Sequence, residues 1–220
     1  MKKILYAIAL IIYTSQFCFT SFSCASKKSS ISELAKACYN EGNSKAKFQD
    51  YEGAIADYTR AIEFNPQYVK AYNNRGTAKS ILEDHLGAIH DHTKAININP
   101  NYAIAYFNRG NSKDDLKDYE GAISDYNKVI ELNPDYTKAY IKRAQIYYSR
   151  GNSKSNLKDY KGAIKDYNKA LELDPDYGDA YYGRGISKYY NNDLNGSCKD
   201  AMKSKSLGYD ASNLIEAVCN

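Results

Sequence analysis

The sequence predicts an all-α protein, a solenoid of about five helical hairpins that ends in a capping helix. Pro66, Pro100 and Pro134 recur every 34 residues, and Pro175 follows 41 residues after Pro134. Around these prolines, the string GAIADYTRAIEFNP returns as GAISDYNKVIELNP and GAIKDYNKALELDP. A fixed period of this length is typical of repeat architectures, in which each unit needs its neighbour to bury its apolar face.

The composition is that of an ordinary globular chain and argues against a nucleic-acid partner. The 220 residues are 43% hydrophobic and 25% charged, and tyrosine is frequent at 23 copies with no Trp. The 30 basic residues are interleaved with 26 acidic ones. Nucleic-acid binding usually needs basic residues gathered on one face, so this balance disfavours it.

Residues 1–25 have the layout of a secretory signal peptide. Lys2 and Lys3 precede ten apolar or aromatic residues, 4–13, and small and polar residues follow. Cleavage after Ala25 would place small residues at both positions that signal peptidase requires. We therefore expect export, to the periplasm or the extracellular space, followed by a flexible linker over residues 26–34.

Two alternatives remain for this segment. The uncharged span between Lys3 and Lys27 could serve as an uncleaved membrane anchor, although its apolar part is short. Lipidation at Cys24 is the other alternative, although Ser21 and Phe22 do not fit the residues expected before a lipidated cysteine. A membrane contact is expected only in these two cases.

Each unit reads as two helices joined by a polar break. An aspartate stands in each break, where it suits the N-cap of the second helix, and proline marks the end of that helix in the first four units. The predicted units cover residues 35–68, 69–102, 103–136, 137–177 and a degenerate 178–206, with a capping helix in 207–220. The cap aspartates are Asp50, Asp84, Asp118, Asp159 and Asp193.

A 34-residue helical hairpin with Gly at position 8, Ala at 20, an aromatic residue at 24, Ala at 27 and Pro at 32 resembles the tetratricopeptide repeat (TPR). The first unit carries Gly42, Ala54, Tyr58, Ala61 and Pro66 at these positions. The resemblance implies a right-handed superhelix of the bacterial exported type, whose first helices line a concave groove. Two positions depart from the family pattern, because Arg replaces Leu at position 7 and Lys replaces Tyr at position 11.

Seven extra residues precede the fourth repeat. Arg143–Ala144 and Arg150–Gly151 are themselves seven residues apart, and seven residues make almost two helical turns. The buried face is thus preserved, and we expect an extended first helix that protrudes beyond its neighbours.

Asp occurs at position 23 of all five units, whereas Arg at position 7 is missing only from the first, where Glu41 stands. This asymmetry predicts that each Arg pairs with the Asp of the preceding unit, for example Arg75 with Asp57.

Two cysteines near the carboxyl end are placed to form a disulfide. Cys198 lies in the last hairpin and Cys219 in the predicted cap, so a disulfide between them is expected in an oxidising compartment. Cys38 is expected to be a small buried residue.

Nothing in the sequence arranges catalytic or metal-binding residues, so we expect neither an enzyme nor a cofactor. His90 and His92 diverge by about 200° on a helix, which prevents them from sharing a metal ion. Asp174, Asp176 and Asp179 lie in a turn but lack the spacing of a calcium loop.

The remaining function is recognition of another protein or peptide. In the TPR family, positions 2, 5, 6, 9, 12 and 13 of the first helices face the ligand. Asn side chains there can hold a peptide backbone through a donor and an acceptor, although a polar groove that faces only water is the alternative. The candidate residues are Lys36, Asn40, Asn43, Lys70, Asn74, Asn108, Asn111, Asp114, Tyr148, Asn152, Tyr182 and Tyr189.

Chaperone-docking TPR proteins use a carboxylate clamp, which this sequence matches only in part. Asn43 and Asn74 fit the clamp, whereas Tyr39, Ile104 and Asn108 do not. Our leading hypothesis is an exported scaffold that binds an extended segment of another protein. The alternatives are a membrane-tethered envelope assembly factor and a cell-wall glycan binder that uses the tyrosines near the carboxyl end.

Overall fold

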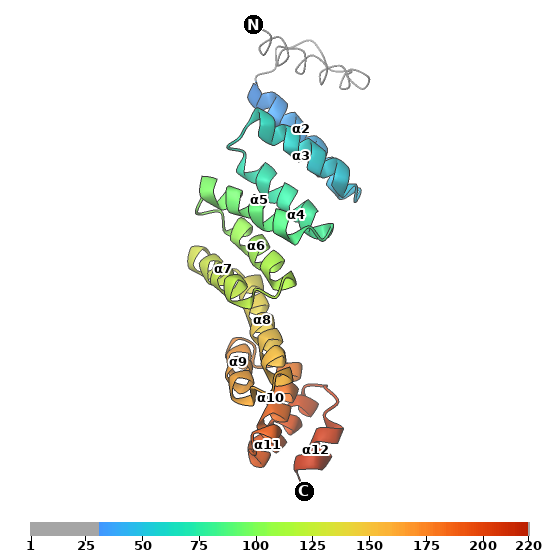
Figure 1. Ribbon diagram of the computed structural model, residues 1–220, viewed down its shortest axis with the longest axis vertical. Helices are drawn as coiled ribbons and strands as arrows, with labels where there is room; N and C mark the ends of the chain where they lie inside the picture. Colours follow the sequence, from blue (N-terminus) through green and yellow to red (C-terminus); the bar gives the residue numbers. More distant parts are fainter. Residues whose placement is uncertain (1–30, 220) are drawn as a thin grey trace.

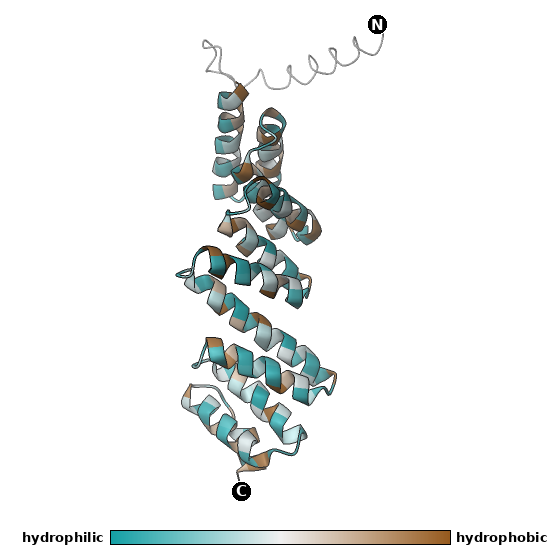
Figure 2. Ribbon diagram, turned by 90° about the vertical axis from the view of Figure 1, so that its left-hand side faces the viewer, coloured by the Kyte–Doolittle hydropathy of each residue, from teal (hydrophilic) through white to brown (hydrophobic). Residues whose placement is uncertain are grey.

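The computed structural model describes residues 31–219, which form eleven α-helices and no strand. The helices follow one another as hairpins that stack into an elongated array (Figure 1). The predicted signal peptide, Cys24 and residues 26–30 of the predicted linker lie outside the described residues. Figure 2 shows mostly teal and white helices with scattered brown segments, as expected of helices that bury one narrow stripe.

The five units each contain a first and a second helix. The first helices are α2 (Ile31–Lys47), α4 (Val69–Ile81), α6 (Ala103–Asp115), α8 (Thr137–Asn156) and α10 (Gly178–Tyr190). The second helices are α3 (Tyr51–Phe64), α5 (His85–Ile98), α7 (Tyr119–Leu132), α9 (Tyr160–Leu173) and α11 (Leu194–Ser206). The short helix α12 (Ser212–Val218) follows them.

Helix α2 begins earlier than expected. The predicted linker over residues 26–34 is wrong for its last four residues, because Ile31 already belongs to the helix. Glu33 lies in the first turn, where the partial positive charge of the helix amino terminus favours a carboxylate, and Leu34 is half-buried.

The predicted N-caps are confirmed in all five units. Asp50 Oδ1 accepts a hydrogen bond from the backbone N–H of Gly53 at 2.9 Å, and the four other aspartates make the equivalent bond at 2.8–3.0 Å. Each bond satisfies a backbone donor that the first turn of a helix would otherwise leave open.

Gly at position 8 lets the two helices of a unit approach closely. A Cβ atom added to Gly42 would lie 2.7 Å from the ring of Tyr58, and one added to Gly110 would lie 2.9 Å from the ring of Tyr126. Ala54, at position 20, has no exposed surface. These small residues are therefore structural, because the position-24 ring fills the space beside them.

Helix α8 has 20 residues, whereas α4, α6 and α10 have 13 each. Its amino-terminal half packs on α7, where Ala139 and Ile146 join the core around Tyr126. Its carboxyl-terminal half packs on α9, where Gly151 faces the ring of Tyr167. The expectation that α8 protrudes is therefore wrong, because the added turns bury one continuous stripe against two successive second helices.

The arginine at position 7 binds the aspartate of its own unit, so the predicted pairing between neighbouring units is wrong. Arg75 Nε and Nη2 donate to the two oxygens of Asp91 at 2.8 and 2.7 Å, and Lys79 Nζ lies 2.8 Å from the same carboxylate. Positions 7 and 23 face each other across the hairpin, which brings the three charges together. The same geometry joins Arg109 to Asp125, Arg150 to Asp166 and Arg184 to Asp200.

The link between units is made by the remaining nitrogen of the guanidinium group. Arg75 Nη1 donates to Thr59 Oγ1 of the preceding unit at 3.0 Å. In the first unit, where Glu41 replaces the arginine, Asp57 pairs with Lys45 at 2.7 Å and with Arg60 at 3.4 Å. The Lys at position 11 therefore compensates the aspartate in every unit.

In the fourth unit two arginines reach the preceding unit, because Arg150 Nη1 also donates to Glu120 Oε1 of α7 at 2.9 Å. Arg143 Nη1 donates to Asn127 Oδ1 of the preceding unit at 2.6 Å, whereas Arg150 binds Asp166 of its own unit. Arg143 Nε is buried and has no hydrogen-bond partner among the described residues. Within residues 31–219, Arg143 therefore forms no ion pair with a carboxylate.

The carboxyl end of the array is capped and stapled. Leu214 and Val218 of α12 pack against Ala201 of α11. A disulfide joins Cys198 to Cys219, as the sequence predicted. Cys38 is buried against α3 and α4, also as expected.

Candidate functional site

The first helices present the candidate residues on one surface, which we call the first-helix surface and define by positions 2, 5, 6, 9, 12 and 13 of each unit. Lys36, Asn40, Lys70 and Tyr189 are exposed. The other candidates are half-buried: Asn43, Asn74, Asn108, Asn111, Asp114, Tyr148, Asn152 and Tyr182.

Internal hydrogen bonds hold the two asparagines that match the chaperone clamp. Asn43 Oδ1 accepts from Tyr58 Oη at 2.9 Å and from Asn74 Nδ2 at 2.9 Å. Asn74 Nδ2 also donates to Tyr39 Oη at 3.1 Å. Tyr39, which stands where the clamp has a lysine, therefore takes part in positioning Asn74.

The bond between the tyrosine at position 24 and the asparagine at position 9 recurs along the array. Tyr126 Oη donates to Asn111 Oδ1 at 2.7 Å, and Tyr167 Oη donates to Asn152 Oδ1 at 2.6 Å. Burial raises the pKa of Tyr126, so its hydroxyl remains a donor. Within residues 31–219 the side-chain nitrogens of Asn111 and Asn152 make no hydrogen bond, which leaves these donors available to a ligand.

The second unit replaces this arrangement with a different polar network. Asn73, Thr77 and His92 stand at positions 5, 9 and 24. Asn108 Nδ2 donates to Asn73 Oδ1 at 3.1 Å and to Thr77 Oγ1 at 3.3 Å. His92 has no exposed surface, and neither ring nitrogen has a hydrogen-bond partner among the described residues. Burial lowers the pKa of His92 to about 4.

A pocket of about 270 Å³ lies on the first-helix surface between the first two units. Asn43 and Asn74 contribute polar groups to it, and Ala46 and Ile81 contribute apolar ones. The Ile81 side chain is 51% exposed. The remaining lining residues are Tyr51, Tyr58, Thr77 and Ala78.

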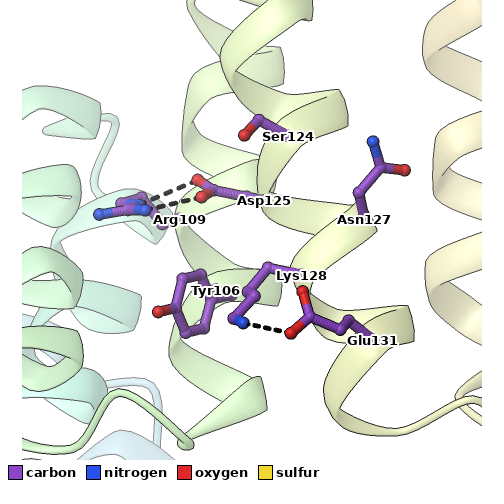
Figure 3. A pocket seen from close by; sticks show the side chains of 7 residues that line it. All are labelled: Tyr106, Arg109, Ser124, Asp125, Asn127, Lys128 and Glu131. Carbon is purple, nitrogen blue, oxygen red and sulfur yellow. Dashed lines mark hydrogen bonds and ion pairs between the residues drawn. The ribbon is translucent and has the colours of Figure 1, made fainter.

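A second pocket, of about 370 Å³, lies beside α6 and α7 and was not predicted from the sequence. Figure 3 shows Arg109 bound to Asp125, and Lys128 bound to Glu131, in its wall. These charges compensate one another, and the pocket contains no histidine or cysteine. Tyr106, Ser124 and Asn127 complete the lining, which offers polar contacts but no paired nucleophile and base.

The acidic centre of the first-helix surface lies at Asp114 and Asp115. Burial raises the pKa of Asp114, Lys142 opposes this effect, and the neighbouring Asp115 adds to it. The Asp115 carboxylate lies 3.4 Å from His85 Nδ1.

The tyrosines predicted near the carboxyl end belong to three separate ring pairs. Tyr189 contacts Tyr190 at 5.2 Å between ring centroids. Tyr148 instead contacts Tyr177 at 5.0 Å, and Tyr182 contacts Tyr209 at 4.8 Å. Tyr177 and Tyr209 were not singled out from the sequence, although Tyr177 shares position 34 with other tyrosines.

Among residues 31–219, no three His, Cys, Asp or Glu side chains are grouped so that they could hold a metal ion. In the same range, none of the helices combines the length and the apolar character needed to cross a membrane.

Comparisons with known proteins agree with this architecture. The family model "Tetratricopeptide repeat" matches residues 103–136 and 144–177, and the model "TPR repeat" matches residues 42–79. The match that begins at 144 omits the first seven residues of α8. No match was found among curated protein sequences.

Three solved structures illustrate the similarity. A MamA protein shares 23% identity with a TM-score of 0.63 over 80% of this chain and 92% of its own. YrrB, described as a TPR protein with an unusual peptide-binding site, shares 20% identity with a TM-score of 0.61 over 82% and 89%. The first TPR of Spaghetti (RPAP3), bound to the HSP90 peptide SRMEEVD, shares 30% identity with a TM-score of 0.52 over 52% and 91%. With its repeats, its hairpins and these matches, the chain belongs to the tetratricopeptide repeat family.

Proposed function

We propose that this chain is an exported, non-catalytic scaffold that binds an extended segment of another protein along its first-helix surface. The observation that carries the proposal is the pocket between α2 and α4. There the ordered amides of Asn43 and Asn74 lie beside the exposed apolar side chain of Ile81. Such a pairing suits a peptide, whose backbone needs polar partners while its side chains need apolar contact.

The solved relatives support a peptide as the class of ligand. The RPAP3 domain was solved with a bound peptide, and the YrrB structure is described by its peptide-binding site. In this chain Tyr39 stands where the clamp has a lysine, so this position offers no positive charge to a carboxylate. The Tyr39 hydroxyl instead accepts a hydrogen bond from Asn74. We therefore propose a ligand held through its backbone and side chains rather than through a terminal carboxylate.

Export is supported by two independent features. Residues 1–25 have the layout of a signal peptide. The disulfide between Cys198 and Cys219 is of a kind that persists in oxidising compartments. Sequencing the amino terminus of the protein recovered from cells tests this part, because cleavage predicts a mature chain that starts at Ser26.

Site-specific photocrosslinking in cells tests the binding surface. A photoreactive phenylalanine analogue replaces Ile81 in the pocket, and in a matched control it replaces Lys94, which is exposed on the second helix α5. We expect discrete crosslinked proteins from position 81 and none of them from position 94. The same products from both positions, or none from position 81, would contradict binding at the first-helix surface.

A further inference from the structure

The charge at position 2 of the first-helix surface reverses at the carboxyl end of the array. Lys36 and Lys70 occupy this position in the first two units, Ile104 in the third and Gln145 in the fourth, whose repeat match begins at residue 144. Asp179 occupies it in the last unit, near the start of α10. Position 2 therefore carries a carboxylate only in the last unit.

Two tyrosine pairs lie near the start of α10, and the Asp179 carboxylate acts electrostatically on Tyr177 and Tyr209. Tyr148 contacts Tyr177, and Tyr182 contacts Tyr209, with ring centroids 5.0 and 4.8 Å apart. A Cβ atom built on Gly178 would lie 3.6 Å from Tyr209 Cβ, which brings the two pairs together at the start of α10. These groups also interact electrostatically. The pKa of Tyr177 is raised mainly by burial and further by Tyr148 and Asp179.

Asp179 differs from the aspartates of the repeat core because no cation accompanies it. Asp200, in the same unit, binds both Arg184 and Lys188. Among the described residues, no Lys, Arg or His forms an ion pair with Asp179. The carboxylate also stabilises the amino terminus of α10, but that role does not require two tyrosine pairs nearby.

We propose that Asp179 and the tyrosines Tyr148, Tyr177, Tyr182 and Tyr209 form a binding site for a cationic side chain, Lys or Arg, of the bound protein segment. The faces of tyrosine rings attract a cation, and a nearby carboxylate neutralises its charge. The inference rests on the proposed function and adds the ligand chemistry at one end of the surface. It also gives the ligand a direction, because the equivalent tyrosine pair of the first unit, Tyr39 and Tyr68, is followed by Lys70.

Peptide titration followed by NMR tests this site. The probes are the blocked pentapeptide Ac-Gly-Gly-Arg-Gly-Gly-NH2 and the same peptide with neutral citrulline in place of arginine. They are added to the full-length, oxidised chain labelled with ¹⁵N. We expect the arginine peptide to shift the amide signals of residues 177–182 and 209, and the citrulline peptide to bind about tenfold more weakly.

Matched variants separate the charge from the rings. Asp179→Asn should weaken binding of the arginine peptide about three- to tenfold, and Tyr182→Leu about two- to fivefold. Tyr182→Phe keeps the ring face and should bind like the wild type, as should Lys70→Gln at the other end. Unchanged amide signals elsewhere show that each variant is folded.

The inference is overturned if the arginine and citrulline peptides bind equally, or if Asp179→Asn and Tyr182→Leu both bind like the wild type. The proposed function has its own readout. Crosslinks from position 81 that persist while the arginine peptide fails would leave the scaffold role intact and remove only the cation site.

Discussion

His92 should make the stability of the protein sensitive to mild acid. The side chain stands at position 24, where three other units have tyrosine, and it lies beneath the surface with both ring nitrogens unpartnered within residues 31–219. Burial lowers its pKa from 6.5 to about 4, and the adjacent charges of Asp91, Arg109 and Asp125 modify this only in part. Protonation would place a positive charge where no acceptor receives it.

The sign and the size of the effect follow from proton linkage. Between pH 6.5 and 4 the unfolded chain binds the histidine proton and the folded chain does not, so stability falls as the pH falls through this window. A pKa difference of about 2.5 units corresponds to about 3 kcal/mol of unfolding free energy. The pKa of Asp91, buried but held below 3.8 by Arg75 and Lys79, affects stability only at lower pH.

Urea unfolding followed by circular dichroism between pH 7 and 4 tests this reasoning. We expect the unfolding free energy of the wild type to fall by about 3 kcal/mol more than that of His92→Phe, whose ring occupies the same space without titrating. His90→Gln, at an exposed histidine of the same helix, should behave like the wild type. An equal loss of stability in the wild type and in His92→Phe would refute the argument.

Three further outcomes follow from the packing. Arg109→Met should destabilise the fold by about 2–3 kcal/mol, because it removes two charge-assisted hydrogen bonds to the buried Asp125 and leaves it only the ion pair with Lys113, whereas Arg143→Met, which breaks no ion pair, should cost less; equal melting temperatures for the two variants would contradict this. Reducing the Cys198–Cys219 disulfide should cost about 3 kcal/mol through the freedom regained by a 21-residue loop, and hydrogen exchange should quicken in α11 and α12 but not in α2, while unchanged exchange would count against a stapled cap. Gly110→Ala should cost about 1–3 kcal/mol by thermal unfolding, because the new Cβ meets a tyrosine ring at 2.9 Å, and a neutral result would show that the ring can move aside.

The repeat architecture was predictable because its signals are local. An aspartate three residues before a glycine determines the start of each second helix, and the hydrogen bond from Gly53 to Asp50 needs no information from elsewhere in the chain. The disulfide was predictable because only one pairing joins the cap to the last hairpin.

The partners of the charged residues were not predictable in the same way. Arg75 lies 18 residues after Asp57 and 16 before Asp91, and periodicity alone favours neither aspartate. The first unit has Glu41 in place of the arginine, and this suggested that each arginine pairs with the aspartate of the preceding unit. That inference was wrong, because Lys45 and Arg60 compensate the charge of Asp57. A lysine at position 11 of every unit was the available signal, since it implies a carboxylate within each hairpin.

The sequence predicted which residues lie on the candidate surface but not the hydrogen bonds between them. The sequence placed Asn43 and Asn74 on the same face, and the structure joins them through a hydrogen bond that depends on side-chain direction. In the sequence, Tyr39 was noted only because it does not match the chaperone clamp, although its hydroxyl orients Asn74. Side-chain hydrogen bonds between units depend on the superhelical packing, which residue spacing alone does not define.

Helix α8 packs on both α7 and α9, and its extra length affects the spacing of contacts for any ligand that follows the array. Arg143, which binds α7, and Arg150, which binds α9, lie seven residues apart on α8, or about 10 Å along its axis. An extended chain advances about 3.3 Å per residue, so a ligand needs roughly three additional residues to pass this step. The array would then recognise two separate blocks of its partner, one read by the first three units and one by the last two.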